Sequence, residues 1–258
     1  MMKRFIFSIF LLPLLLASPQ TKAQGIMLTP KWTAQAQFTG YYVADKLGFY
    51  KEEGIDVCVQ HPAISESSFS FMEKGRAPVV IMNLSYAFME RLAGARVVNV
   101  MQTSQENSLM LISHSPLKGE ESLRNQKIAV WNHLSQKLLD RLAEHYALKQ
   151  VGWIRFNSGV NVFLSGAADP CLVGSYNEYL QLSEYGMNVD SIYSIRLADY
   201  GYNLPEDGLY VTEEFYNQYP EVVRKLVKAS MRGWAWTNEH REEALDMVME
   251  LSLIHISE

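Results

Sequence analysis

Cysteine, basic clusters and catalytic signatures are scarce or missing in this chain of 258 residues. Two cysteines cannot build the disulfide framework that stabilises small secreted domains. Lysine and arginine number 23 against 28 acidic residues, and no basic run offsets the net charge of -5, so nucleic acid is not an expected partner. The hydrophobic share of 48%, with 15 glycines and 9 prolines, excludes a disordered or collagen-like chain.

Signatures of the common enzyme classes are missing as well. The sequence has no Gly-x-Ser-x-Gly nucleophile elbow, no P-loop, no dinucleotide-binding glycine fingerprint and no His-Glu-x-x-His zinc motif. Neither Cys58 nor Cys171 has a histidine or a second cysteine at metal-ligand spacing. Each lies in an apolar run, so we expect two buried, unbonded thiols, with a disulfide as the alternative that export would permit. The sequence predicts a binding protein without a catalytic residue, cofactor or metal.

One apolar run of about a dozen residues lies at the start of the chain. Lys3 and Arg4 precede the apolar residues 5–17, and small residues follow around Ala23. This order is typical of a cleaved secretory signal, and the run is shorter than the ~20 apolar residues of a membrane span. We expect residues 1–24 to be removed on export to the periplasm, with an uncleaved anchor as the alternative. Cleavage would remove three cations and no acidic residue, so the mature protein would be more acidic.

Beyond residue 24, short β-type runs alternate with helical segments. Strands are expected at residues 25–32, 55–60, 78–82, 95–101, 109–113, 127–130, 150–155, 168–173, 189–195 and 208–212. Helices are expected at residues 38–53, 65–74, 84–93, 133–147, 221–237 and 241–251. Strands separated by helices predict βαβ units and a parallel sheet.

Breaks in this pattern near residues 113 and 200 predict an α/β protein of two lobes. The first lobe would comprise residues 25–113 and 200–251, and the second residues 114–199. Residues 252–258 are expected to be a tail that is not native to the protein. A discontinuous layout of this kind places a cleft between the lobes, where the ends of strands and helices converge on a small molecule.

The densest cluster of aromatic and polar side chains follows the first expected strand. It includes Trp32, Gln35, Gln37, Phe38 and Tyr41. Amide groups beside aromatic rings can hold a flat, polar ligand by stacking and by hydrogen bonds to its edge. The alternative is that these aromatic side chains pack in the core.

The segment QAQFTGYYVADKLGFYKEEGIDV, residues 35–57, resembles the NMT1/THI5-like (SsuA/THI5-like) family of periplasmic substrate-binding proteins. Further similar segments are VGWIRF at residues 151–156 and GSYNEYLQLSEYG at residues 174–186. The likeness covers nearly all of residues 26–250. It implies a type II periplasmic-binding fold with two lobes and two crossovers, a small-molecule ligand, an ABC transporter permease as partner, and a monomer. Thiamine-pyrimidine-precursor receptors belong to this family.

Carried over position by position, the resemblance implies four ligand-binding loops, residues 32–38, 83–85, 131–135 and 174–178. The implied ligand-binding residues outside the first loop are Tyr41, Asn83, Trp131, Asn132, Tyr176, Asn177, Glu178 and Tyr200. In the last loop, Asn177 and Glu178 would hold the amino and ring nitrogens of a pyrimidine. Asn83 and Glu178 also stand where residues cap helices, which is the alternative for both.

Two departures from the family pattern leave the ligand open. Pyrimidine-precursor receptors carry Asn-Thr-Asn-His where this chain has Gln35-Ala36-Gln37-Phe38, and sulfonate receptors carry a Gly-Ser type sequence where it has Asn132-His133. The expected function is capture of a small heteroaromatic, such as a pyrimidine-type thiamine precursor, for ABC import. The alternatives are a ligand-sensing domain of a signalling protein and a THI5-type pyrimidine synthase, although the cysteine-rich motif of those synthases is missing here.

Overall fold

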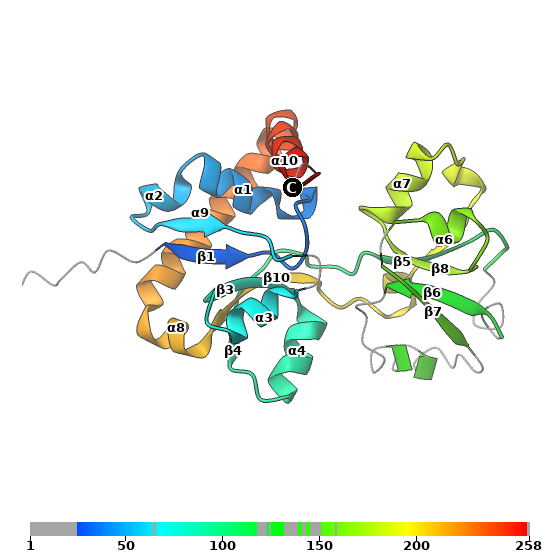
Figure 1. Ribbon diagram of the computed structural model, residues 1–258, viewed down its shortest axis with the longest axis horizontal. Helices are drawn as coiled ribbons and strands as arrows, with labels where there is room; N and C mark the ends of the chain where they lie inside the picture. Colours follow the sequence, from blue (N-terminus) through cyan, green and yellow to red (C-terminus); the bar gives the residue numbers. More distant parts are fainter. Residues whose placement is uncertain are drawn as a thin grey trace, which may run out of the picture.

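A computed structural model describes residues 25–63, 66–117, 123, 125–131, 139–140, 143–144, 151–157 and 159–256. The expected signal peptide, Asn132 and most of the expected helix at residues 133–147 lie outside the described residues. The described elements form two α/β lobes, each built on a five-stranded sheet (Figure 1). Within this part of the chain, no helix is both long and apolar enough to cross a membrane.

The first lobe contains a sheet of strand order β2-β1-β3-β10-β4. Strands β1 (Ile26–Thr29), β2 (Val57–Val59) and β3 (Val79–Asn83) are parallel. Strand β10 (Asp207–Thr212) is antiparallel to both β3 and β4 (Val97–Gln102). The expected parallel sheet is therefore wrong at β10, because the chain returns from the second lobe and inserts a strand between β3 and β4.

Helices cover both faces of this sheet. They are α1 (Thr39–Lys46), α2 (Phe49–Glu52), α3 (Ser68–Glu73), α4 (Leu84–Leu92), α8 (Glu213–Gln218), α9 (Pro220–Glu239) and α10 (Arg241–Ile256), with a 3-10 turn η1 (Ala36–Phe38) before α1. Side chains alternate along β3: Val79 and Ile81 join the core under α1 and α9, whereas Val80 and Met82 join the core under α3. The single helix expected at residues 38–53 is broken because Gly48 adopts a φ of 78°.

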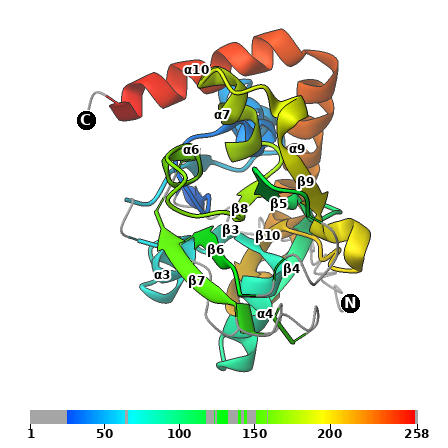
Figure 2. The ribbon, with the colours of Figure 1, turned by 90° about the vertical axis from the view of Figure 1, so that its right-hand side faces the viewer.

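The second lobe contains a sheet of strand order β7-β6-β8-β5-β9. Its strands are β5 (Leu109–Ser113), β6 (Lys127–Trp131), β7 (Gly152–Phe156), β8 (Cys171–Gly174) and β9 (Tyr193–Arg196). Helices α6 (Asn161–Leu164) and α7 (Glu178–Glu184) lie on the same side of this sheet (Figure 2). Short 3-10 turns η3 (Val189–Ser191) and η4 (Leu197–Tyr200) flank β9. Side chains alternate along β5 as well: Met110 and Ile112 pack in one hydrophobic core, and Leu109 and Leu111 pack in another, so both faces of the sheet are covered.

Both cysteines are free thiols. Cys171 is fully buried in β8, as expected, whereas Cys58 is exposed. The expectation of a buried Cys58 is wrong because β2 is an edge strand, and the inward-facing position next to it is taken by Val57.

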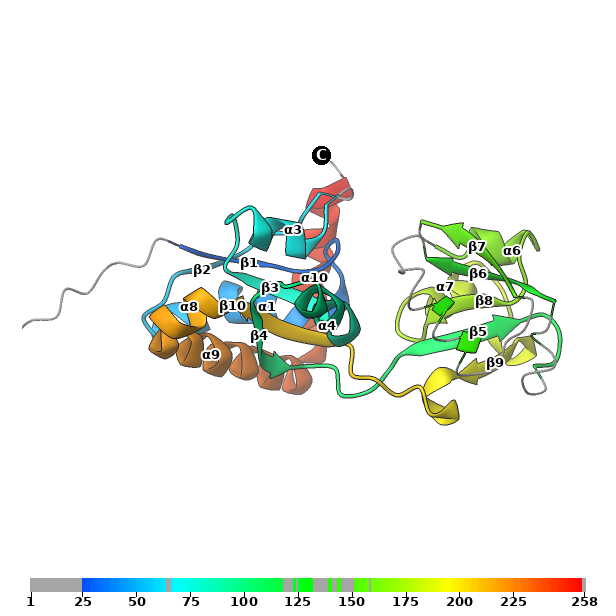
Figure 3. The same ribbon diagram turned by 90° about the horizontal axis from the view of Figure 1, so that it is seen from below.

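Two segments connect the lobes and run side by side (Figure 3). The first lies between Gln102 and Leu109, because β5 belongs to the second sheet and not, as expected, to the first lobe. The second lies between Tyr200 and Asp207. The carbonyl oxygen of Asp207 accepts hydrogen bonds from the backbone N–H groups of Thr103 and Ser104, at 3.0 Å each. These bonds hold the two crossing segments together at the base of the space between the lobes.

Candidate ligand-binding cleft

Two adjoining cavities lie between the lobes, and both are lined by residues of both lobes. The outer cavity has a volume of about 300 Å³, and the inner cavity about 70 Å³. They adjoin because Lys31, Trp131 and Tyr176 line both. The outer cavity is otherwise lined mainly by Trp32, Gln35, Gln37, Asn157, Asn177 and Gln181. The inner cavity is otherwise lined mainly by Asn83, Asn107, Ser108, Tyr202, Leu204 and Glu206.

Lys31 lies at the junction of the two cavities, just after β1. Its Nζ forms an ion pair with Asp207 Oδ1 at 2.5 Å and donates a hydrogen bond to Asn83 Oδ1 at 2.6 Å. Asn83 and Asp207 are direct partners in the pairing of β3 with β10, which places both oxygens beside the same cation. Asn83 makes no side-chain cap to α4, so the capping alternative for it is wrong. The charge of Lys31 is therefore balanced inside its own lobe.

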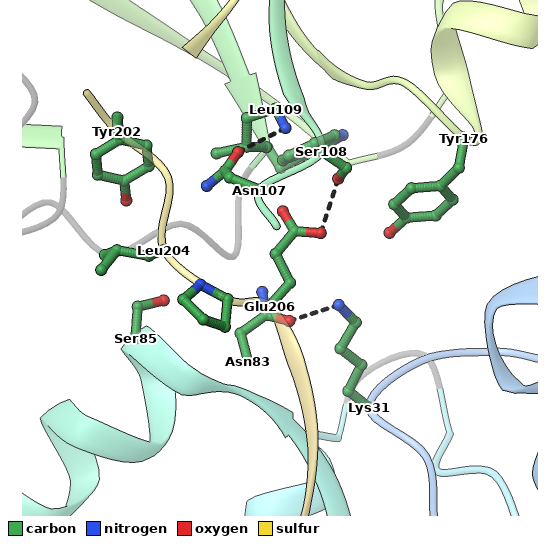
Figure 4. Close-up of a pocket in the computed structure, with 12 residues that line it drawn as sticks. Lys31, Asn83, Ser85, Asn107, Ser108, Leu109, Tyr176, Tyr202, Leu204 and Glu206 are labelled. Carbon is green, nitrogen blue, oxygen red and sulfur yellow. Dashed lines mark hydrogen bonds between the residues drawn. The ribbon is translucent and has the colours of Figure 1, made fainter. Parts of the chain in front are cut away.

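Glu206 projects from the second crossing segment into the inner cavity (Figure 4). Its Oε2 accepts a hydrogen bond of 2.7 Å from the hydroxyl of Ser108, on the first crossing segment. Burial raises the pKa of this carboxyl above its ordinary value, while the Ser108 hydrogen bond and the charge of Lys31 act in the opposite direction. Tyr176 reaches the same space from the second lobe. The inner cavity thus combines a hydrogen-bond acceptor with aromatic walls.

Glu178 is the buried first residue of α7. Its Oε1 accepts a 3.0 Å hydrogen bond from Trp131 Nε1, and its Oε2 accepts a 3.1 Å bond from the backbone N–H of Gly174. The N-cap of α7 is Asn177, which makes no side-chain cap, so the expected spacing with Ser175 does not produce a capping box. Both carboxylate oxygens are engaged, and Glu178 holds the Trp131 ring in the wall of the cleft.

Glu178→Gln is expected to lower the free energy of unfolding by about 1–3 kcal/mol, because an amide can satisfy only one of the two N–H donors. The other donor would face the amide NH₂ group. Urea denaturation measures the loss, and Glu184→Gln, at the exposed end of the same helix, is the matched control. Equal stability of the two variants would show that Glu178 does not position Trp131.

The structure brings most of the expected site residues together. Those that line the cavities are Trp32, Gln35, Gln37, Asn83, Trp131, Tyr176, Asn177 and Glu178. Phe38 and Tyr41 are buried in the first-lobe core, where Tyr41 packs edge-on against Trp234 at a centroid distance of 5.7 Å, so their placement at the cleft was a wrong expectation. The turn η1 and helix α1 direct both rings inward. Asn132 and the side chain of Tyr200 lie outside what the structure describes.

The lining residues that were not expected from the sequence are Lys31, Asn107, Ser108, Leu109, Asn157, Gly159, Gln181, Tyr202, Leu204, Pro205 and Glu206. Lys31 stands beside the aromatic cluster, and Glu206 belongs to an acidic pair directly before a buried strand, which is a recognisable signal. Asn157 directly follows β7 and Gln181 lies in the middle of α7, and the sequence around them carries no comparable signal. Among the described residues, no group of three or more His, Cys, Asp or Glu side chains could hold a metal ion.

Comparison with known proteins gives relatives of two kinds, proteins named for binding a small molecule and enzymes named as pyrimidine phosphate synthases. The riboflavin-binding protein RibY of Chloroflexus aurantiacus is 27% identical over 246 residues, which are 90% of this chain and 67% of RibY. The formylaminopyrimidine-binding protein of Halalkalibacterium halodurans is 24% identical over 96% of this chain and 79% of its own. The 4-amino-5-hydroxymethyl-2-methylpyrimidine phosphate synthase THI13 of Saccharomyces cerevisiae is 22% identical over 77% of this chain and 62% of its own.

A solved structure and a family profile agree with these relatives. The periplasmic aliphatic sulphonate binding protein SsuA of Escherichia coli superposes with a TM-score of 0.67 at 14% identity, over 89% of this chain and 79% of SsuA. That likeness shows the fold, a two-lobed α/β fold of the periplasmic-binding-protein type, and confirms the expected fold class. The profile described as NMT1/THI5 like matches residues 35–244. Because this match spans most of the chain, the protein belongs to the NMT1/THI5-like family.

Proposed function

We propose that the protein is an exported, periplasmic solute-binding protein that captures a small heteroaromatic ligand and delivers it to an ABC importer. The observation that carries this proposal is a single cleft to which both lobes contribute aromatic and hydrogen-bonding side chains. Two hydrogen-bonded crossing segments form its base, an arrangement suited to hinge closure around a ligand. Closure would bring Trp32 of one lobe toward Trp131 of the other and exclude water from the ligand.

The charges of the inner cavity favour a ligand with hydrogen-bond donors on its ring edge. Glu206 offers carboxylate oxygens, and a carboxylate accepts strong hydrogen bonds from amine or ring N–H groups. Lys31 is already paired with Asp207, so it is a weak receptor for a free anion such as a sulfonate. Riboflavin and formylaminopyrimidine, for which two relatives are named, are both heteroaromatic compounds with N–H donors.

Isothermal titration calorimetry on the purified protein tests the proposal with riboflavin, formylaminopyrimidine, hydroxymethylpyrimidine and an alkanesulfonate. We expect at least one heteroaromatic compound to bind and the sulfonate to bind more weakly. Trp131→Ala should weaken binding about 10-fold or more, because the ring lines both cavities and stacking on an aromatic wall contributes about 1 kcal/mol beyond its buried area.

Tyr185→Ala is the matched control for Trp131→Ala, since Tyr185 is an exposed aromatic residue of the same lobe that lines neither cavity. Absence of binding by every compound at millimolar concentration would overturn the proposal. The names of several relatives raise pyrimidine synthesis as the competing function. It would appear as a change in the intact protein mass after incubation with iron and pyridoxal phosphate, and our proposal expects no change.

A further inference from the structure

The wall of the outer cavity is rich in side-chain carboxamides. Gln35 and Gln37 contribute from the first lobe, and Asn157, Asn177 and Gln181 from the second. Each carboxamide has a carbonyl oxygen that accepts and an NH₂ group that donates hydrogen bonds. Gln181 Nε2 donates a hydrogen bond of 2.9 Å to Asn177 Oδ1, which fixes the orientation of both carboxamides. The carbonyl oxygen of Gln181 and the NH₂ group of Asn177 are not used by this bond.

The charged groups that reach the outer cavity are already engaged within the protein. Glu178 accepts hydrogen bonds on both carboxylate oxygens, and Lys31 is bound to Asp207 and Asn83. Lys31 is also the one cation among the described residues that line this cavity. The lining offers a ligand the uncharged carboxamides of Gln35 and Gln37, and the Gln181 oxygen and Asn177 NH₂ group that their mutual hydrogen bond does not use. These groups lie in the same cavity wall as the indole rings of Trp32 and Trp131.

Hydroxyl groups match such a wall better than charged groups do. A hydroxyl both donates and accepts, as a carboxamide does, so neighbouring hydroxyls on a chain or a sugar ring can pair with neighbouring amides. The C–H faces of the same polyol can pack against the indole rings. A phosphate, in contrast, would lose its hydration here, because Lys31, the cation of the described lining, is already paired with Asp207, and Glu178 places a carboxylate at the start of α7.

We infer that the ligand carries a neutral, polyhydroxylated substituent, a sugar or a linear polyol, on its heteroaromatic ring. This inference rests on the proposed function. The donor edge of the ring faces Glu206 in the inner cavity, the ring lies beside Trp131 and Tyr176 where the two cavities meet, and the polyol occupies the outer cavity among the carboxamides.

Matched compounds with and without the polyol test the inference. Riboflavin is compared with lumiflavin, which has a methyl group in place of the polyol on the same ring system, and cytidine is compared with 1-methylcytosine. In at least one pair we expect the polyol-bearing compound to bind 10-fold or more tightly than its bare ring. Riboflavin 5′-phosphate should bind more weakly than riboflavin. Gln37→Leu should reduce the difference between polyol-bearing and bare compounds several-fold.

Gln218→Leu, on an exposed position at the end of α8, is the control for the loss of a carboxamide. Equal binding of bare and polyol-bearing rings would overturn this inference and leave the proposed function standing. Tighter binding of the phosphate ester, or an unchanged difference in Gln37→Leu, would also overturn it. If no compound of either kind binds at millimolar concentration, the proposed function itself fails, and this inference fails with it.

Discussion

Gly233→Ala is expected to lower the free energy of unfolding by about 3 kcal/mol, the upper part of the usual range for overpacked sites. Gly233 lies where α9 crosses α1, and a Cβ atom there would be 2.0 Å from the carbonyl oxygen of Gly40 and 2.9 Å from the Cβ of Ala44. The first of these atoms is backbone, so no side-chain rotation can relieve the clash. The two helices would have to separate, and the core that they share with β1 and β3 would loosen.

Thermal or urea unfolding followed by circular dichroism measures this effect. Gly152→Ala is the matched control, because a Cβ at that position of β7 would be 3.5 Å from the nearest atom, an ordinary contact. That control should keep or slightly increase stability, since alanine restricts the unfolded chain. A stability of Gly233→Ala within about 0.5 kcal/mol of the unchanged protein would show that the α1–α9 contact is more adaptable than its geometry indicates.

Much of the fold follows from local patterns in the sequence. Short apolar runs separated by helical segments predicted most of the elements, and their order predicted two α/β lobes. The position of β10 could not be predicted from its own residues. Its pairing with β3 and β4 depends on where the chain returns from the second lobe, and a buried apolar run is equally compatible with parallel and antiparallel neighbours.

The candidate site was predictable to a smaller degree. Trp32 and Phe38 stand six positions apart in one aromatic cluster, yet the first lines the outer cavity and the second is fully buried. What separates them is the η1 turn, whose direction the residue types do not encode. Gln181 lines the outer cavity because α7 begins at Glu178. Glu206 lines the inner cavity because the second crossing segment lies beside Ser108 of the first. These are tertiary relations, and composition alone does not report them.

Glu206→Gln is expected to weaken ligand binding about 10- to 100-fold while making the ligand-free protein more stable near neutral pH. The loss of affinity follows from the proposed role of Glu206 as the charged acceptor for the ring edge, since a hydrogen bond to a charged group contributes about 1.5–3 kcal/mol. A glutamine carbonyl can still accept the hydrogen bond from Ser108, so the crossing segments remain connected. The variant changes the charge and preserves the shape.

The gain in stability follows from the raised pKa of Glu206, whose largest cause is burial. A carboxyl with a higher pKa in the folded than in the unfolded protein binds its proton more tightly when folded. Its contribution to stability is complete below the unfolded pKa and is lost as the pH rises through the folded pKa. Glutamine does not titrate and avoids this loss, so the variant should be more stable than the unchanged protein at about pH 7, and the advantage should shrink toward about pH 4.

Calorimetric titration and thermal unfolding at both pH values measure the two effects, with Glu213→Gln as the control, since Glu213 lies outside both cavities in a loose ion pair with Arg96 at 3.7 Å. If Glu206 had only a structural role, its substitution would lower the stability of the protein and would weaken ligand binding only through that loss. A carboxylate held in the cleft for the ligand instead costs stability while the cleft is empty. A Glu206→Gln variant that binds ligand more weakly but is more stable therefore identifies a ligand-binding role for Glu206. A fall in both affinity and stability would instead show that Glu206 stabilises the segments that connect the lobes.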